Sequence, residues 1–297
     1  MNFKLIAAAA ALAVSGAANA AIDNMLSANS SALFYGYNTT TGTSVVVDLG
    51  VNLNDFLPAY TMLGEPGNVP QGALSKQGVT AVWNFNANTY TLNGTQVAGA
   101  PANNWAAAFS SFVNSVSAGG NTFKWGVLAG DNTSDVDLVG KHLVSGTPTD
   151  AQLEGQTDSS SANLGQANDL FINLNVFNLI NGADNAAYYA AASSDPGYVA
   201  KNTNLNFQGN LKGNLGWQTV TNGATTGTSV TNLTLVVEEG SEVRVGAFGD
   251  ELGTLTLDAA AGTLTWQTTA VPEPSTYAMV LAGLALGGLV VRRRAAK

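Results

Sequence analysis

Short runs in which apolar and polar residues strictly alternate are the feature that most constrains the fold of this 297-residue chain. The clearest pair is Gly253-Thr-Leu-Thr-Leu257 and Gly262-Thr-Leu-Thr-Trp266, separated by a short Ala-rich connection. Because successive side chains on a strand point to opposite faces, each run presents one apolar and one polar face. The sequence therefore predicts an antiparallel hairpin with an inward face made of Leu255, Leu257, Leu264 and Trp266.

The same pattern recurs between residues 21 and 270, with Thr, Ser and Asn at the polar positions and Gly in the turns. In the segment 170–176 we expect a strand whose buried face is Leu170, Ile172, Leu174 and Val176. Other strands are predicted at Ala32–Tyr37, Ser44–Leu49, Thr80–Phe85, Thr89–Asn93, Phe123–Ala129, Gly140–Val144, Leu233–Val237 and Val243–Ala247.

One segment has helical spacing instead, with apolar residues at Trp105, Phe109, Phe112, Val113 and Val116. An Asn just before it and Gly119-Gly120 after it are typical of a helix N-cap and a helix stop. We therefore predict an all-β, antiparallel β-sandwich or jelly-roll-like ectodomain over residues 21–270, with one helix inserted. Two stacked sandwiches joined by the polar stretch 146–168 are the alternative.

The first 20 residues indicate export. Lys4 precedes an apolar stretch, and Ala18-Asn19-Ala20 is an A-x-A site for signal peptidase, which would leave Ala21 as the mature N-terminus. We therefore interpret residues 1–20 as a cleaved signal peptide.

Residues 271–297 form a second segment outside the fold. Pro272, Glu273 and Pro274 favour stiff, extended backbone. An uncharged stretch from Tyr277 to Val291 follows, and Arg292, Arg293 and Arg294 end it. As a helix this stretch would be about 22 Å long, which is short for a hydrocarbon core of about 30 Å. The Arg cluster is expected to stay in the cytoplasm, which places the ectodomain outside.

This tail resembles the PEP-CTERM sorting signal of Gram-negative bacteria, in which Pro-Glu-Pro, a transmembrane helix and a basic end occur in that order. The resemblance implies recognition by an exosortase, a membrane cysteine protease-transpeptidase, and an association with exopolysaccharide and extracellular matrix. It also implies transient anchoring in the inner membrane, followed by release to the cell surface.

Charge and composition exclude several functions. Residues 21–270 hold six Lys and Arg against nineteen Asp and Glu, a net charge of −13, so nucleic acid is not an expected partner. Divalent cations or neutral polymers such as polysaccharide suit this surface better. The chain has no cysteine, which removes disulfides, thiol chemistry and Cys-based zinc sites.

No motif predicts an enzyme. The single histidine, His142, lies in a predicted strand without a G-x-S-x-G motif, and we interpret it as structural. Glu238, Glu239 and Glu242, with Asp250 and Glu251, lie at predicted strand ends, but their separation in space cannot be read from the sequence. We predict no required cofactor.

The best metal candidate is Asp131-Asn-Thr-Ser-Asp-Val-Asp137, in which Asp131, Thr133, Asp135 and Asp137 offer hard oxygen ligands suited to Ca²⁺. The segment lacks the Gly and the final acidic residue of an EF-hand, and the alternative is a solvated acidic loop.

Exposed aromatic rings could stack on sugars. Tyr35 and Tyr37 share a face with Leu33 and are expected in the core, whereas Tyr188 and Tyr189 are expected in an open loop or short helix. Trp217 is a further candidate. Three functions thus remain: a non-catalytic surface or matrix protein, which we favour, a lectin-like carbohydrate-binding module, and a secreted glycan hydrolase.

Overall fold

The computed structural model describes residues 23, 29–57, 60–61, 68–69, 71–98, 104–131, 141–146, 174–180, 186–199, 221–239, 242–245 and 252–268. The predicted signal peptide and the sorting tail lie outside these residues. Within the described part of the chain, no helix is both long and apolar enough to cross a membrane.

Antiparallel β-structure dominates the described residues, as the alternation predicts. The strands are β1 (Ser31–Asn38), β2 (Thr43–Asn52), β3 (Tyr60–Thr61), β4 (Asn68–Val69), β5 (Thr80–Asn84), β6 (Thr89–Leu92), β7 (Thr95–Gln96), β8 (Thr122–Asp131), β9 (Lys141–Ser145), β10 (Ala187–Ala190), β11 (Thr221–Ala224), β12 (Thr228–Glu239), β13 (Glu242–Val245), β14 (Gly253–Asp258) and β15 (Thr263–Thr268). The helical elements are two short 3-10 helices, η2 (Leu53–Phe56) and η3 (Ala73–Ser75), the helix α2 (Trp105–Ala118) and one helical turn at residues 174–176.

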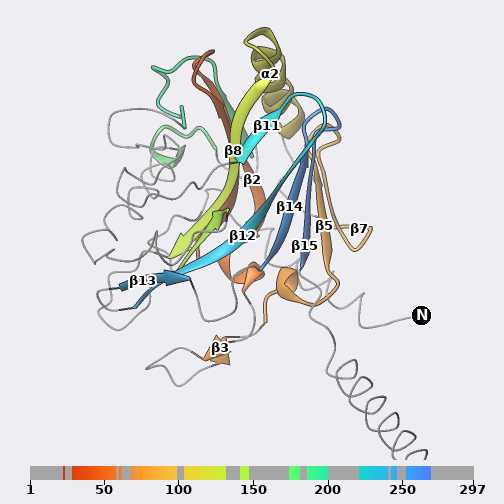
Figure 1. Ribbon diagram of the computed structural model, residues 1–297, viewed down its shortest axis with the longest axis vertical. Helices are drawn as coiled ribbons and strands as arrows, with labels where there is room; N and C mark the ends of the chain where they lie inside the picture. The colour runs from red at the N-terminus through yellow and green to blue at the C-terminus, as the bar shows by residue number, and fades with distance from the viewer. Residues whose placement is uncertain are drawn as a thin grey trace, which may run out of the picture.

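Thirteen of these strands belong to one sheet, in the order β10-β2-β1-β8-β9-β12-β14-β15-β5-β6-β7, with β11 paired to β8 and β13 to β12 (Figure 1). The β3-β4 pair is separate. The predicted hairpin is confirmed as β14-β15, and the strands predicted around β1, β2, β5 and β6 are confirmed too. β1 pairs with β2 and β5 with β6, antiparallel in each case. An antiparallel, mostly β fold with one long helix is therefore confirmed for the described residues.

The two halves of this sheet face each other across one core. The Trp83 indole on β5 donates a hydrogen bond to the Leu49 carbonyl of β2 (2.8 Å), although β5 and β2 are far apart in the strand order. The rings of Phe34 on β1 and Phe85 after β5 lie 5.1 Å apart, centroid to centroid. The two layers that a sandwich requires are thus the two halves of one continuous sheet.

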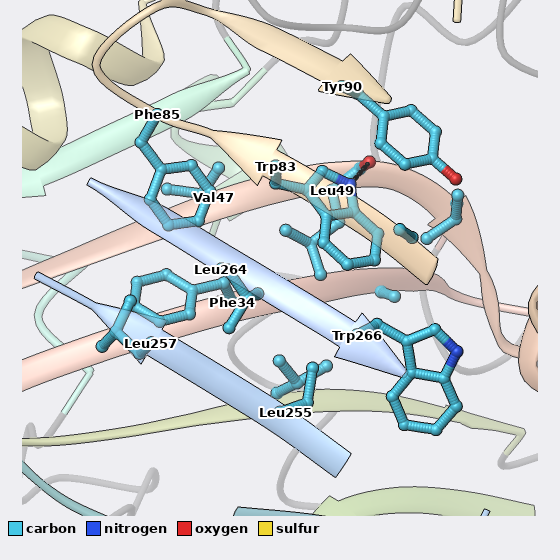
Figure 2. Packing of buried hydrophobic residues seen from close by; sticks show 14 of the residues in the cluster. Phe34, Val47, Leu49, Trp83, Phe85, Tyr90, Leu255, Leu257, Leu264 and Trp266 are labelled. Carbon is cyan, nitrogen blue, oxygen red and sulfur yellow. Dashed lines mark hydrogen bonds between the residues drawn. The ribbon is translucent and has the colours of Figure 1, made fainter. Parts of the chain in front are cut away.

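Aromatic side chains fill the space between the halves (Figure 2). Trp83 stacks on Tyr90 with centroids 5.1 Å apart and planes 3° from parallel, and Phe56 meets Trp266 edge-on at 5.4 Å. The Trp266 indole donates to the Leu74 carbonyl of η3 (2.9 Å). Because the chain has no disulfide, burial of apolar side chains, these large rings among them, is the main source of stability, at roughly 25 cal/mol per Å² of apolar surface.

The helix α2 closes one end of the core (Figure 1). Its apolar face is the predicted one. The ring centroids of Phe109 and Phe85 lie 4.9 Å apart, and those of Phe112 and Phe123 lie 5.3 Å apart. Its stop at Gly119 is confirmed, with the Gly119 N–H bonded to the Val116 carbonyl.

The prediction that an Asn side chain caps the N-terminus of α2 is wrong, although an Asn does hold the cap position. Asn104 holds the cap position with φ of 69° and makes no side-chain cap bond. Its amide group instead donates to the Ala187 carbonyl (3.3 Å), and the Ala106 N–H near the start of the helix donates to the Asn88 side chain (2.9 Å). A residue from the β5-β6 turn thus serves the helix terminus, which short-range sequence patterns do not reveal.

The strand predicted at Leu170–Val176 is also wrong where it can be seen. Residues 174–176 form a helical turn, in which Leu174 is buried but Val176 is 71% exposed. Leu170 and Ile172 lie outside the described residues. Alternation over so few residues does not distinguish a strand from one helical turn with a single buried side chain.

Candidate functional site

The sorting tail follows strand β15 in the sequence. β15 itself lies inside the sheet, between β14 and β5. It is hydrogen-bonded along its length to β14, through the register Gly253↔Thr268 to Asp258↔Thr263, and to β5 on the other side. The inward-facing residues predicted for the β14-β15 hairpin, Leu255, Leu257, Leu264 and Trp266, are all at most 1% exposed.

Thr268, the last described residue, is held at the end of this strand by the segment that leads into β5. The Thr268 hydroxyl donates to the Lys76 carbonyl (3.1 Å) and accepts from the Val79 N–H (3.2 Å). The Thr268 N–H donates to the Val79 carbonyl (3.3 Å). The folded domain therefore fixes the chain only four residues before Pro272.

The residues of the tail itself lie outside the described part of the chain. These are Pro272, Glu273 and Pro274 of the motif and the cluster Arg292 to Arg294. The cleavage residues Ala18, Ala20 and Ala21 lie outside it too. Covalent geometry alone places Pro272 within about 14 Å of Thr268, because four residues span at most about 3.3–3.6 Å each.

The predicted calcium site is only partly in view. Asp131 ends β8, where its backbone pairs with Lys141 of β9, whereas Thr133, Asp135 and Asp137 lie outside the described residues. Among the side chains that the structure describes, no group of three or more His, Cys, Asp or Glu could hold a metal. The Ca²⁺ site therefore stays a prediction.

Two other titratable candidates lie on strands, as expected. His142 is in β9 and pairs through its backbone with Gly130 of β8 and Val236 of β12. Glu238 and Glu239 end β12 and Glu242 begins β13, in a register that places Glu239 opposite Glu242. Asp250 and Glu251 lie outside the described residues.

The tyrosines differ from the prediction in part. Tyr35 and Tyr37 are buried as expected, at 0% and 3% exposure. Burial, reinforced by nearby Tyr198, raises the pKa of Tyr37 to about 12. Tyr188 and Tyr189 lie in the edge strand β10 rather than in a loop or helix, because this segment pairs with Val45 and Val46 of β2. Trp217 lies outside the described residues.

Tyr188 is not an open platform for a sugar ring. Its hydroxyl donates to the Asp195 carboxylate (2.8 Å), which also accepts the Gly197 N–H (2.9 Å). The Gly197 Cα lies against the Tyr188 ring so closely that a Cβ there would come within 2.6 Å of it. Partial burial, with the bond to Asp195, raises the pKa of Tyr188 to about 12.

The structure adds a buried carboxylate, Asp48 on β2, that the sequence reasoning missed. Its side chain is 6% exposed and accepts the Gly50 N–H (2.8 Å). Burial raises the pKa of Asp48 to about 7. The Gly50 bond lowers it, and the nearby Asp23 carboxylate raises it. The available signal was one charge inside the apolar run Val45-Val-Val-Asp-Leu49.

Strand pairing joins the polar faces predicted for single strands into one polar outer face, on the side of β12, β14, β15, β5 and β6 that points away from the core. Register aligns its side chains in rows across the strands, for example Val230, Thr256, Thr265, Val82 and Thr91. Its residues are half-buried or exposed, and Asp258 is the one charged side chain among them. They are Thr80, Val82, Asn84, Thr89, Thr91, Thr228, Val230, Asn232, Thr254, Thr256, Asp258, Thr263, Thr265 and Gln267.

The Asp258 carboxylate forms a hydrogen bond within the β14-β15 turn, where it accepts the Ala261 N–H (2.9 Å). The polar outer face therefore offers rows of hydroxyl and amide groups with almost no charge, in a chain whose net charge is −9.

Comparison with known proteins identifies the tail. Residues 270–294 match the family model of the PEP-CTERM protein-sorting motif. No curated protein and no solved structure matches the chain. The chain thus carries a sorting signal for export and exosortase recognition, as the resemblance implied, and the match covers only this C-terminal segment.

Proposed function

We propose that the domain between the signals is a non-catalytic structural or adhesive component of the cell surface or extracellular matrix, linked to exopolysaccharide. The sorting motif at residues 270–294 carries this proposal, because it marks the chain as an exported exosortase substrate. A sheet bonded across thirteen strands supports a structural role, since its strands satisfy each other's backbone groups and hold the tail on a central strand.

Binding of neutral polysaccharide is the second candidate, and the polar outer face favours it. Thr, Asn and Gln side chains can exchange hydrogen bonds with sugar hydroxyls, and the scarcity of charge suits an uncharged polymer. The face carries no aromatic side chain, since Trp83, Tyr90 and Trp266 of the same strands point into the core. Affinity for a single sugar unit would therefore be low, with binding to a long chain through many sites.

A panel of polysaccharides tests both candidates on residues 21–270. The structural proposal expects no hydrolysis of any polymer, and the binding proposal expects retention on neutral polymers that the double variant Thr256→Lys and Thr265→Lys abolishes. Hydrolysis lost on changing Glu239 or Glu242 to Gln would overturn the non-catalytic role in favour of a glycan hydrolase.

The processing step is tested on the full chain in its native host. We expect a mature C-terminus near Pro272–Pro274, and accumulation of the uncut form in the membrane after Glu273→Ala with Pro274→Ala. A mature protein that keeps Arg292 to Lys297 while an exosortase is present would show that the tail is only an anchor.

A further inference from the structure

The side chains of the polar outer face form three rows that cross the neighbouring strands β12, β14, β15, β5 and β6 (Figure 1). Strand register defines each row, because residues paired across antiparallel strands lie opposite each other. The central row is Val230, Thr256, Thr265, Val82 and Thr91. One flanking row is Thr228, Asp258, Thr263, Asn84 and Thr89. The other flanking row is Asn232, Thr254, Gln267 and Thr80.

The central row is a stripe of methyl groups. Each of its side chains is Val or Thr, and so carries a methyl group on a branched Cβ. Val230 at one end is 56% exposed, and the other four are half-buried. With strands about 4.8 Å apart, the five positions extend over about 19 Å. The stripe therefore offers a ligand a row of methyl groups that no charged side chain interrupts.

The flanking rows offer hydrogen bonds on both sides of this stripe. They lie about 7 Å from it, since two residues along a strand span that distance. All their side chains except Asp258 are Thr, Asn or Gln, which can donate and accept hydrogen bonds. The Asn84 side chain is oriented by its own turn, where its oxygen accepts the Ala87 N–H (2.9 Å). The polar outer face thus combines an apolar stripe with a hydrogen-bonding row along each edge.

One kind of neutral sugar chain has the same arrangement of groups. In a β-1,4-linked glucan every ring substituent is equatorial, so the C–H bonds form two apolar ring faces and the hydroxyls lie along the two edges of an extended ribbon. An α-1,4-linked glucan coils and presents no such ribbon. A ribbon laid across the strands places its ring faces on the central row and its hydroxyl edges beside the flanking rows.

The twist of the sheet distinguishes a single chain from a crystal. Neighbouring strands in sheets are rotated by about 20–25° relative to each other, so a row that crosses five strands winds by roughly 80–100° from end to end. A single glucan chain can follow this winding by rotation about its glycosidic bonds, whereas the surface of a crystalline fibre is flat. A separate chain can therefore contact the whole row, and a flat crystal can contact only part of it.

We propose that the polar outer face binds single chains of a neutral, β-1,4-linked, all-equatorial polysaccharide of the cellulose type, which lie across the strands along the central row. This inference rests on the second function proposed above, the binding of neutral polysaccharide. Charge supports an uncharged ligand, because residues 21–270 carry a net charge of −13 and repel an anionic polymer. Each sugar contributes little, and affinity grows with the number of sugars until the stripe is filled.

Opposite substitutions in the two kinds of row test the inference. The readout is depletion of the full chain, expressed in its native host and purified in detergent, by swollen amorphous cellulose. Thr256→Val with Thr265→Val keeps the methyl groups and should leave the affinity unchanged. Thr256→Ser with Thr265→Ser removes two methyl groups and should lower it about fivefold or more. In a flanking row, Thr254→Val removes a hydroxyl and should lower it several-fold.

Ser117→Ala, at an exposed position of α2, is the control that should change nothing. The Val variants keep side chains that favour strands, so a loss of binding in Thr254→Val is not a loss of folding. Weak binding by the Val double variant together with normal binding by the Ser double variant would overturn the assignment of the central row.

Other polymers separate this inference from the function on which it rests. Strong binding to swollen cellulose, with weak binding to amylose and to microcrystalline cellulose, supports a single ribbon-like chain. Equal binding to amylose, or a preference for microcrystalline cellulose, would overturn the inference and leave polysaccharide binding in place. A protein that binds no neutral polymer at all would reject the binding function itself. Self-association without polymer that Thr256→Lys with Thr265→Lys abolishes would assign the face to a second copy of the chain and overturn the inference.

Discussion

The two halves of the sheet differ on the side that faces away from the core. In β14, β15, β5 and β6 this side is the polar outer face, and only the inner side is buried. In β1, β2 and β8 almost every residue is buried on both sides, including Leu33, Tyr35 and Val46 on the side away from the core. One continuous sheet thus contains a half with a single buried side and a half with two.

The half formed by β1, β2 and β8 is overlaid by residues from a distant part of the chain, 174–180 and 186–199, which we call the cover. The Val199 N–H donates to the Ser44 hydroxyl on the outer side of β2 (3.1 Å), and β10 extends the sheet beside it. Leu174, Ile180 and Tyr198, from the same part of the chain, are buried as well, and Tyr198 lies near the outward-facing Tyr37 of β1. Thr-Leu-Thr-Leu therefore marks a strand with one buried side, whereas Ser-Val-Val-Val marks a strand that is buried on both sides.

The largest expected difference between the halves is the loss in free energy of unfolding when an outward-facing side chain is truncated. Tyr35→Ala should lower the free energy of unfolding by about 3–5 kcal/mol, because it leaves a cavity under the cover. Thr265→Ala, at an outward position of the other half, should cost at most about 1 kcal/mol. Urea unfolding of the two variants measures this, and equal losses would mean that the halves are not different.

The next effect is the pH dependence contributed by Asp48 on the covered half. Its pKa of about 7 when folded, against 3.8 in the unfolded chain, means that the folded state binds an extra proton between these values. The associated stability is full below about pH 4 and is lost as pH rises through 7, by a few kcal/mol in all. Asp48→Asn should flatten this slope between pH 4 and 7 in thermal or urea unfolding, while Asp258→Asn, on the polar outer face, should leave it in place.

A smaller effect is expected at Gly197 in the cover. A methyl group there would meet the Tyr188 ring at 2.6 Å and Leu179 at 2.7 Å. Because this overpacks the site, Gly197→Ala should lower the free energy of unfolding by about 1–3 kcal/mol. Differential scanning calorimetry against Ala260→Ser, an exposed change in the other half, gives the comparison. A melting temperature unchanged by Gly197→Ala would show that the cover yields easily.

The smallest effect concerns calcium at the β8-β9 connection. If Asp131, Thr133, Asp135 and Asp137 bind Ca²⁺, millimolar Ca²⁺ should raise the melting temperature by mass action, by an amount that grows with concentration. Asp135→Asn should remove the increment, and Mg²⁺ serves as the control ion. A melting temperature that does not change at millimolar Ca²⁺ would show that these residues do not form a calcium site.

The half with one buried side was the part that sequence patterns described best. Alternation alone predicted the β14-β15 hairpin with its four inward side chains, since a pattern with a period of two and a Gly-containing turn is local information. The same patterns found β1, β2 and β8 as strands. They missed the cover, because it joins residues near 190 to a strand near 45, and no local rule links such distant segments.

The errors have related causes. Tyr188 and Tyr189 stand between alanines without alternation, and only pairing with the edge of β2 makes them a strand. The N-terminus of α2 is completed by Asn88 from another turn rather than by its own cap residue. For the functional site, the tail motif was recognisable because its signal is a contiguous order of residues. The extent of the polar outer face depends on strand order, which the sequence does not display.

Thiol labelling tests most directly the claim that one half of the sheet is covered and the other is open. The chain has no cysteine, so single variants report on one position each. Thr265→Cys, on the polar outer face, should react with iodoacetamide in the native protein within a few-fold of the rate in urea. Val46→Cys, on the outward side of β2, should be protected by at least a hundredfold until the protein unfolds. Equal native rates at the two positions would contradict the account.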